Sequence, residues 1–109
     1  MASSELQDSW RKTTEFLRDA RAHLSEAAEG VSADEISEFD DYLRHNELEL
    51  ALDSLEAAVL KSPGETLHVF EFLVLAAENM GLAGHTARYR AAIENMHRGT
   101  EERWKKREP

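Results

Sequence analysis

The stretch that decides the fold is residues 67–77, Leu-His-Val-Phe-Glu-Phe-Leu-Val-Leu-Ala-Ala. Nine of these eleven residues are apolar, and they are distributed around every side of a helical projection. A helix that is apolar nearly all round is buried on most of its sides. The stretch therefore predicts a central helix over about residues 65–80, which Gly81 ends.

Before this helix, the first third of the chain carries one long amphipathic pattern. Its apolar stripe recurs at steps of four and three and consists of Leu6, Trp10, Thr13, Leu17, Ala20, Leu24, Ala27 and Val31. This spacing predicts a single helix over residues 4–29 that starts at an N-cap Ser3 or Ser4. Gly30 supplies a residue that adopts positive φ and closes the helix.

Two shorter helices are expected between the long helix and the central one. Ser32-Ala33-Asp34-Glu35 has the pattern of a capping box and predicts a second helix that ends near His45-Asn46. A third helix over about 47–61 precedes the break Ser62-Pro63-Gly64. The residues expected to face inward from these two helices are Ile36, Phe39, Leu43, Leu48, Ala51, Leu52, Leu55 and Val59.

A fifth helix over 84–98 uses Tyr89, Ala92, Ile93 and Met96 and stops at Gly99, and residues 99–109 form a solvated basic tail. Trp104 in this tail suits either folding back or contacting a partner, whereas Trp10 belongs to the core. No alternating β-branched run predicts a strand. We therefore expect an all-α fold, a small antiparallel bundle of about five helices that forms a single domain over residues 1–109.

Composition excludes several classes of function. The 109 residues contain no cysteine, which rules out disulfides, thiolate metal sites and thiol nucleophiles. The formal charge of −9 disfavours nucleic acid and anionic membranes as partners, because both would repel this surface. No apolar run is long enough to span a bilayer, and the polar start of the chain does not resemble a signal peptide. We expect a cytoplasmic protein, and its oligomeric state stays open.

Catalytic chemistry has little support in the sequence. The five histidines are scattered, and none forms the spaced pair with a third ligand that zinc requires. Asp40, Asp41 and His45 lie within one helical turn, but adjacent acids on an acidic helix are usually surface charge. No phosphate-binding glycine loop occurs. We expect no catalytic residues, no metal and no cofactor, and the chain is not predicted to be an enzyme.

The negative charge is concentrated between residues 34 and 56, where nine acids stand against Arg44 alone. Two rows with helical spacing lie opposite the apolar stripes of the second and third helices: Asp34, Glu38 and Asp41, and Glu49, Asp53 and Glu56. Two adjacent helices that carry these rows would form one continuous negative surface. Because like charges at this spacing repel, the surface is predicted to meet a basic protein partner. These six residues are the candidate partner-binding site.

Residues 38–55, Glu-Phe-Asp-Asp-Tyr-Leu-Arg-His-Asn-Glu-Leu-Glu-Leu-Ala-Leu-Asp-Ser-Leu, carry a family resemblance. Together with the turn Asn79-Met80-Gly81-Leu82, this stretch resembles the core of MafI-like immunity proteins of polymorphic and contact-dependent toxin systems. The resemblance covers roughly residues 34–83, within an immunity-like core at 32–83. The long helix in residues 1–31 and the extension after Gly84 depart from it.

The resemblance implies a small helical protein that binds and neutralises a cognate bacterial toxin. Nucleases are frequent among such toxins, and a nuclease needs a basic cleft to hold phosphates. The alternative is a tetratricopeptide-like helical adaptor without a toxin partner, because the helices at 47–80 have the length of one such unit. One pair does not make an array, since stacked repeats need several copies.

Overall fold

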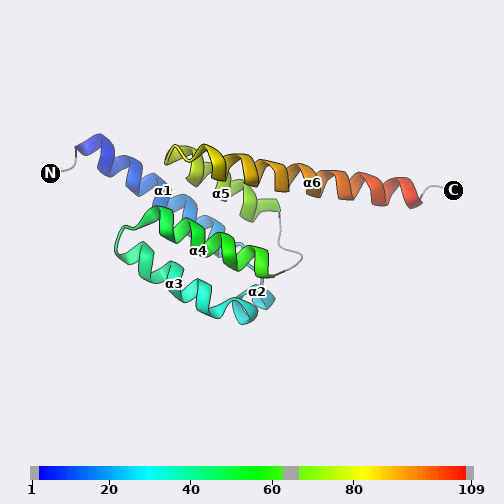
Figure 1. The fold of residues 1–109 in the computed structure, drawn as a ribbon, viewed down its shortest axis with the longest axis horizontal. Helices are drawn as coiled ribbons and strands as arrows, with labels where there is room; N and C mark the ends of the chain where they lie inside the picture. Colours follow the sequence, from blue (N-terminus) through cyan, green and yellow to red (C-terminus); the bar gives the residue numbers. More distant parts are fainter. Residues whose placement is uncertain (1–2, 63–66, 108–109) are drawn as a thin grey trace.

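The computed structural model describes residues 3–62 and 67–107, with side chains as far as Gly99. Apart from short connections, this part of the chain is helical, and it contains no strand, so the predicted all-α bundle is confirmed. Six helices occur within it (Figure 1): α1 Ser4–Ala22, α2 Glu26–Val31, α3 Ala33–Arg44, α4 Leu48–Lys61, α5 Leu67–Asn79 and α6 Ala83–Arg107. Pro63 and Gly64 of the predicted break lie outside the described residues.

The centre of the bundle is α5, which packs against α1 on one side and α6 on the other. The other close pair is α3 and α4, and α4 also contacts α1 (Figure 1). Phe70 and Leu73 of α5 are 6% and 0% exposed, as the apolar stretch predicts. Leu75 is the exception among the large apolar residues of α5, because it is 40% exposed.

The core is formed by the faces that the apolar spacing predicts. Every inward position expected on α3 and α4 is buried or packed against the core, and Tyr89 of α6 is 2% exposed. Trp10 is partly buried against the same cluster, in agreement with its position on the α1 stripe. The apolar periodicity therefore identified most of the interior, but Leu6 and Val31 of the predicted stripe are 44% and 54% exposed.

The predicted single helix over residues 4–29 is wrong, because the chain breaks at His23–Ser25. Ser3 caps α1 as expected and accepts the backbone N–H of Leu6 at 3.1 Å. Ser25 caps a separate helix, α2, by accepting the backbone N–H of Ala28 at 3.1 Å. The new start turns α2 so that Ala28 is buried, whereas Ala27 on the predicted stripe is exposed.

Two local details near Ser32 also differ from expectation. Positive φ occurs at Gly81 (72°) among the described glycines, while Gly30 lies inside α2 and does not end it. Ser32 precedes α3, but its hydroxyl makes no capping hydrogen bond. It is fully buried and donates to the carbonyl oxygen of Ala58 at 2.9 Å, with Ser62 Oγ 3.5 Å away. The predicted capping box is therefore replaced by a link between α3 and the end of α4.

The last helix was predicted to stop at Gly99, but it continues to Arg107. A glycine inside a helix costs only about 1 kcal/mol relative to alanine, so it does not by itself terminate one. The segment predicted as a solvated basic tail is therefore helical from Gly99 to Arg107. The side chain of Trp104 lies outside the described residues, and both interpretations of it stay open.

Candidate functional site

The acidic site is built on the antiparallel pair α3 and α4, which we call the α3–α4 hairpin. Asn46 makes the turn possible with a φ of 56°, a left-handed conformation that asparagine tolerates. The backbone N–H of Glu47 donates to the carbonyl oxygen of Tyr42 at 2.9 Å and closes the turn. Phe39 and Leu52 hold the helices together from the inner side, where they are 1% and 0% exposed.

The six predicted carboxylates lie away from that inner side. We call this set the acidic face: Asp34, Glu38 and Asp41 on α3, and Glu49, Asp53 and Glu56 on α4. Five of the six residues are exposed, whereas the side chain of Glu56 is only 19% exposed. The amphipathic spacing thus placed the carboxylates on the outer side of the hairpin. It did not reveal what lies beside them.

Two of the three carboxylates in the α4 row are paired with α6, which runs parallel to α4 at that point. His85 Nε2 donates to Asp53 Oδ1 at 2.7 Å. Arg88 Nη2 donates to Glu56 Oε1 at 3.0 Å, and this hydrogen bond raises the pKa of Arg88 above its ordinary value. The expectation that bases are nearly absent from this surface is therefore wrong at the C-terminal half of α4. The bases come from a helix about thirty residues further along the chain.

The α3 row is relieved at one position. Asp41 pairs with Arg44 on the next turn, in a contact whose two side chains are 57% and 72% exposed. Ion pairs this exposed contribute little to stability. Among the residues that the structure describes, Asp34, Glu38 and Glu49 form no ion pair and accept no side-chain hydrogen bond. These three carboxylates are the unneutralised part of the acidic face.

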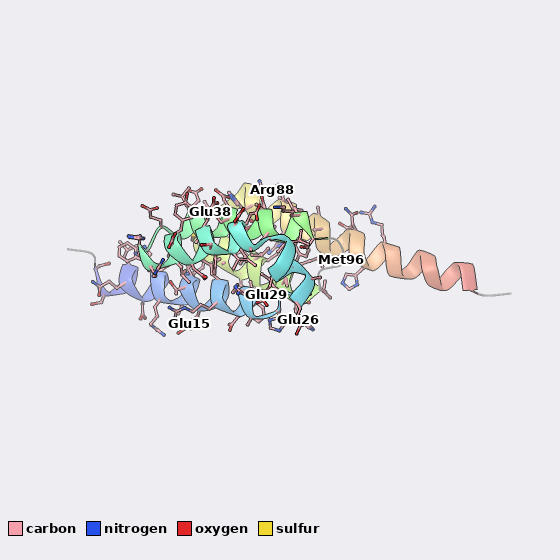
Figure 2. All side chains as sticks on the ribbon, turned by 90° about the horizontal axis from the view of Figure 1, so that it is seen from below. Glu15, Glu26, Glu29, Glu38, Arg88 and Met96 are labelled. Atoms are coloured by element: carbon pink, nitrogen blue, oxygen red, sulfur yellow. The ribbon has the colours of Figure 1, made fainter. Side chains whose placement is uncertain are left out.

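Some acids elsewhere on the molecule are matched by neighbouring bases, whereas others that the structure describes form no ion pair either: Glu5, Asp19, Glu26, Asp40 and Glu47. Arg11 bonds both Asp8 and Glu15 at 3.1 Å, which raises the pKa of Arg11, and Arg21 donates to Glu29 at 2.6 Å. Figure 2 shows Glu15 and Glu29 along the lower edge of the view, with Glu38 along the upper edge. Glu38 therefore lies on a different side of the molecule from the neutralised Glu15.

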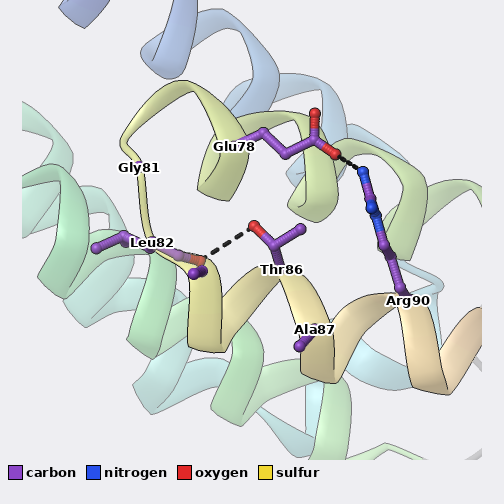
Figure 3. Close-up of a pocket in the computed structure, with 7 residues that line it drawn as sticks. Glu78, Gly81, Leu82, Thr86, Ala87 and Arg90 are labelled. Atoms are coloured by element: carbon purple, nitrogen blue, oxygen red, sulfur yellow. Dashed lines mark hydrogen bonds and ion pairs between the residues drawn. The ribbon is translucent and has the colours of Figure 1, made fainter.

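The hollow at the α5–α6 turn has a structural explanation. It has a volume of about 560 Å³ and lies beside Gly81, Leu82 and Thr86 (Figure 3). Thr86 Oγ1 donates to the carbonyl oxygen of Leu82 at 3.0 Å, and Glu78 is paired with Arg90 across the opening. The polar groups are thus satisfied within the turn. This agrees with the interpretation of Gly81-Leu82-Ala83-Gly84 as an inter-helix turn rather than a phosphate loop.

The same part of the chain has neither a metal-binding cluster nor a membrane-spanning helix. No group of three or more histidines and acids there is arranged to hold a metal ion. His45 Nδ1 donates to the backbone carbonyl oxygen of Asp41 at 2.7 Å, while the Asp41 carboxylate is engaged by Arg44. None of the described helices has both the length and the apolar character that crossing a bilayer requires.

The pairing of helices bears on the tetratricopeptide-like alternative. In such a unit the two consecutive helices pack against each other as an antiparallel hairpin. Here α4 packs mainly on α3, and α5 packs mainly on α1 and α6. The helices within residues 47–80 therefore do not form the close pair that this alternative needs.

Comparison with known proteins adds no relative to this description. The chain matches no protein-family model, no curated protein sequence and no solved structure.

Proposed function

We propose that the chain is an immunity protein that binds a cognate bacterial toxin in the cytoplasm and neutralises it without catalysing a reaction. The toxin presents a basic surface, and a nuclease is the class that best fits this requirement. The observation that carries the proposal is the set of exposed carboxylates Asp34, Glu38 and Glu49, which lack a cationic partner among the described residues. The resemblance of residues 38–55 to MafI-like immunity proteins supports the same interpretation.

The electrostatics of the hairpin favour rapid binding to a basic partner. Complementary charge accelerates encounter and suppresses wrong partners more than it adds raw affinity. An unpaired carboxylate gives up only bound water when an arginine approaches, whereas a paired carboxylate must first break the ion pair with its own base. Glu38 and Glu49 are therefore the expected anchors of the contact. Asp53 and Glu56 contribute less, because His85 and Arg88 already bind them.

Inhibition would follow from occupancy of the toxin's basic cleft. A helical pair that carries outward carboxylates presents negative charge in rows, as a nucleic acid backbone does. It would exclude substrate either by filling the cleft or by covering it. This mechanism needs no metal, cofactor or reactive side chain on the present chain.

The test is a binding measurement on the toxin, purified after capture with the tagged chain from its native strain. Glu38→Lys/Glu49→Lys should bind the toxin at least about thirtyfold more weakly than wild type, which corresponds to about 2 kcal/mol. Wild-type association should also slow as salt rises, because screening shortens to about 8 Å at physiological ionic strength. The variant should accumulate normally yet fail to protect cells from the toxin.

The matched control is Asp19→Lys/Glu26→Lys, which makes the same change in charge on exposed acids of α1 and α2. This control should bind the toxin within about threefold of wild type. Equal losses in the two double variants would show that net charge, and not the acidic face, governs binding. If the captured protein is not toxic to unprotected cells, the immunity proposal is wrong.

A further inference from the structure

A groove separates α1 from α3. Its volume is about 460 Å³, and all the residues that line it belong to these two helices. The two helices do not pack closely on each other, because both contact α4 instead (Figure 1). Pockets that hold small molecules have volumes of about 300–1,000 Å³. The groove is therefore large enough for a small ligand.

Most of the charged side chains that line this groove are neutralised locally. On the α1 wall, Arg21 Nη1 donates to Oε1 of Glu29 in α2 at 2.6 Å. On the α3 wall, Asp41 is paired with Arg44 of the next turn. These two ion pairs contribute no net charge to the groove.

The charges that remain are Arg18 on the α1 wall and Asp40 on the α3 wall. Both residues line the groove, and both are exposed. Neither forms an ion pair or a side-chain hydrogen bond with any other described residue, and they do not pair with each other. The groove thus carries one unneutralised positive charge on one wall and one unneutralised negative charge on the other.

Apolar surface accompanies the two charges. Phe39 and Leu43 of α3 line the same groove. Phe39 is 1% exposed, and Leu43 is partly buried against the core cluster. Sites for small molecules combine an apolar lining with a few polar groups that fix the orientation of the ligand. This groove has both components.

We propose that the groove binds a small organic zwitterion, of the chemical class of the ω-amino acids. Its carboxylate accepts hydrogen bonds from the Arg18 guanidinium, and its ammonium group donates to the Asp40 carboxylate. Its hydrocarbon chain lies against Phe39 and Leu43. Hydrogen bonds between ionised groups are roughly twice as strong as those between neutral ones.

The charge of the whole chain favours a zwitterion over an ion of one sign. The formal charge of −9 opposes the approach of an anion, and Asp40 would repel it again inside the groove. A cation leaves Arg18 without a partner, and the unpaired carboxylates of the acidic face attract it elsewhere. A zwitterion carries no net charge and neutralises both walls at once.

The site is separate from the proposed toxin contact. Arg18 and Asp40 do not belong to the acidic face, and of the six residues in that face Asp41 alone lines the groove. Either proposal therefore stands if the other fails.

NMR titration with ω-amino acids of four to eight carbon atoms tests the site, because the chain length must match the separation of the two charges. The matched controls are the alkanoate and the alkylamine of the same length, which carry one charge each. The backbone amide signals of α3 report binding. The best ω-amino acid should bind saturably with a Kd of about 1 mM or lower, at least about tenfold more tightly than either control.

Arg18→Gln and Asp40→Asn should each weaken binding of that ω-amino acid at least about tenfold, to the level of the singly charged controls. Lys12→Gln and Asp19→Asn are the matched control variants, because these charges are exposed and unpaired on α1 but do not line the groove. They should bind within about twofold of wild type. Circular dichroism should show the same helix content in all four variants, since every substituted side chain is exposed.

Three results overturn the proposal. The first is that no ω-amino acid binds at concentrations up to 20 mM. The second is that an alkanoate or an alkylamine binds as tightly as the ω-amino acid of its length. The third is that Arg18→Gln or Asp40→Asn binds like wild type.

Discussion

His85 Nε2 lies 2.7 Å from Asp53 Oδ1 and joins α6 to α4 across 32 residues of sequence. A carboxylate only accepts hydrogen bonds, so Nε2 carries the proton in this contact. One turn further along both helices, Arg88 repeats the link with Glu56. Together with the Asp41–Arg44 pair, the two contacts divide the acidic face into three carboxylates that the chain neutralises itself and three that stay open.

This division predicts that one double variant keeps the stability of wild type and that another is less stable. Glu38→Lys/Glu49→Lys should change the free energy of unfolding by no more than about 0.5 kcal/mol, because both side chains are exposed and unpaired. Asp53→Lys/Glu56→Lys places new bases against His85 and Arg88, so it should destabilise the fold by about 1–2 kcal/mol. Urea unfolding at pH 7 measures both. Equal stabilities would mean that the α4–α6 contacts carry no energetic weight.

Phe70 tests whether α5 is the centre of the bundle. The side chain is 6% exposed and packs within the main core cluster. Phe70→Ala should lower the free energy of unfolding by about 3–5 kcal/mol, the sum of lost burial and the cavity left behind. Thermal unfolding followed by circular dichroism provides the measurement. Leu75→Ala, at an exposed position of the same helix, should cost less than about 1 kcal/mol.

The helices that were predicted correctly are those whose boundaries have strong local signals. The apolar spacing of α3 and α4 and the positive-φ residue Gly81 depend only on neighbouring residues. The break at Ser25 was missed because Leu24 and Ala27 continue the stripe of α1, although Ser25 and the acidic Glu26 already form an N-terminal signal. The continuation of α6 through Gly99 was missed because this glycine was taken as the end of the helix, despite the helix-forming residues around it.

The sequence predicts where the carboxylates of the candidate site lie, but not which of them are neutralised. Helical spacing places Glu49, Asp53 and Glu56 in one row, and that row exists. Which members of the row are neutralised depends on the neighbour of α4, and no local signal reports that α6 runs beside it. The regular spacing of His85, Arg88 and Asn95 hints at one face of α6, but only the fold shows that this face meets α4.

Ser32 should be more sensitive to substitution than a surface cap. Its hydroxyl is fully buried and bonded to the Ala58 carbonyl oxygen, so Ser32→Ala leaves that acceptor without its partner. We expect a loss of about 1–3 kcal/mol in the free energy of unfolding. Ser37→Ala, at an exposed position of the same helix, should stay within about 0.5 kcal/mol of wild type. Chemical denaturation of the two variants compares them directly.

Tyr89 should make the fold sensitive to alkaline pH. Burial, followed by the nearby Glu56 carboxylate, raises the pKa of Tyr89 above its ordinary value. Because the folded pKa is the higher one, the stabilisation is complete below the unfolded pKa of about 10 and is lost as pH rises above it.

Tyr89→Phe removes both the titration and the buried hydroxyl that lacks a partner. At pH 7 the variant should be as stable as wild type, within about 1 kcal/mol, or more stable. Between pH 9 and 11 it should lose less stability than wild type, as measured by urea unfolding at each pH. Parallel pH profiles would show that the hydroxyl titrates alike in the folded and unfolded states.

The packing of α1 on α5 has a consequence for how the chain is made. Contacts within the α3–α4 hairpin are local and form quickly, whereas α1 must wait for a helix that ends at Asn79. At synthesis rates of about 5–20 residues per second, the interval between Ala22 and Asn79 lasts roughly 3–11 seconds. During that time the apolar stripe of α1 has left the ribosome, but its main partner, α5, is not yet complete. Helix α1 is thus synthesised well before its main partner α5, and its apolar stripe is open to chaperones and proteases during that interval.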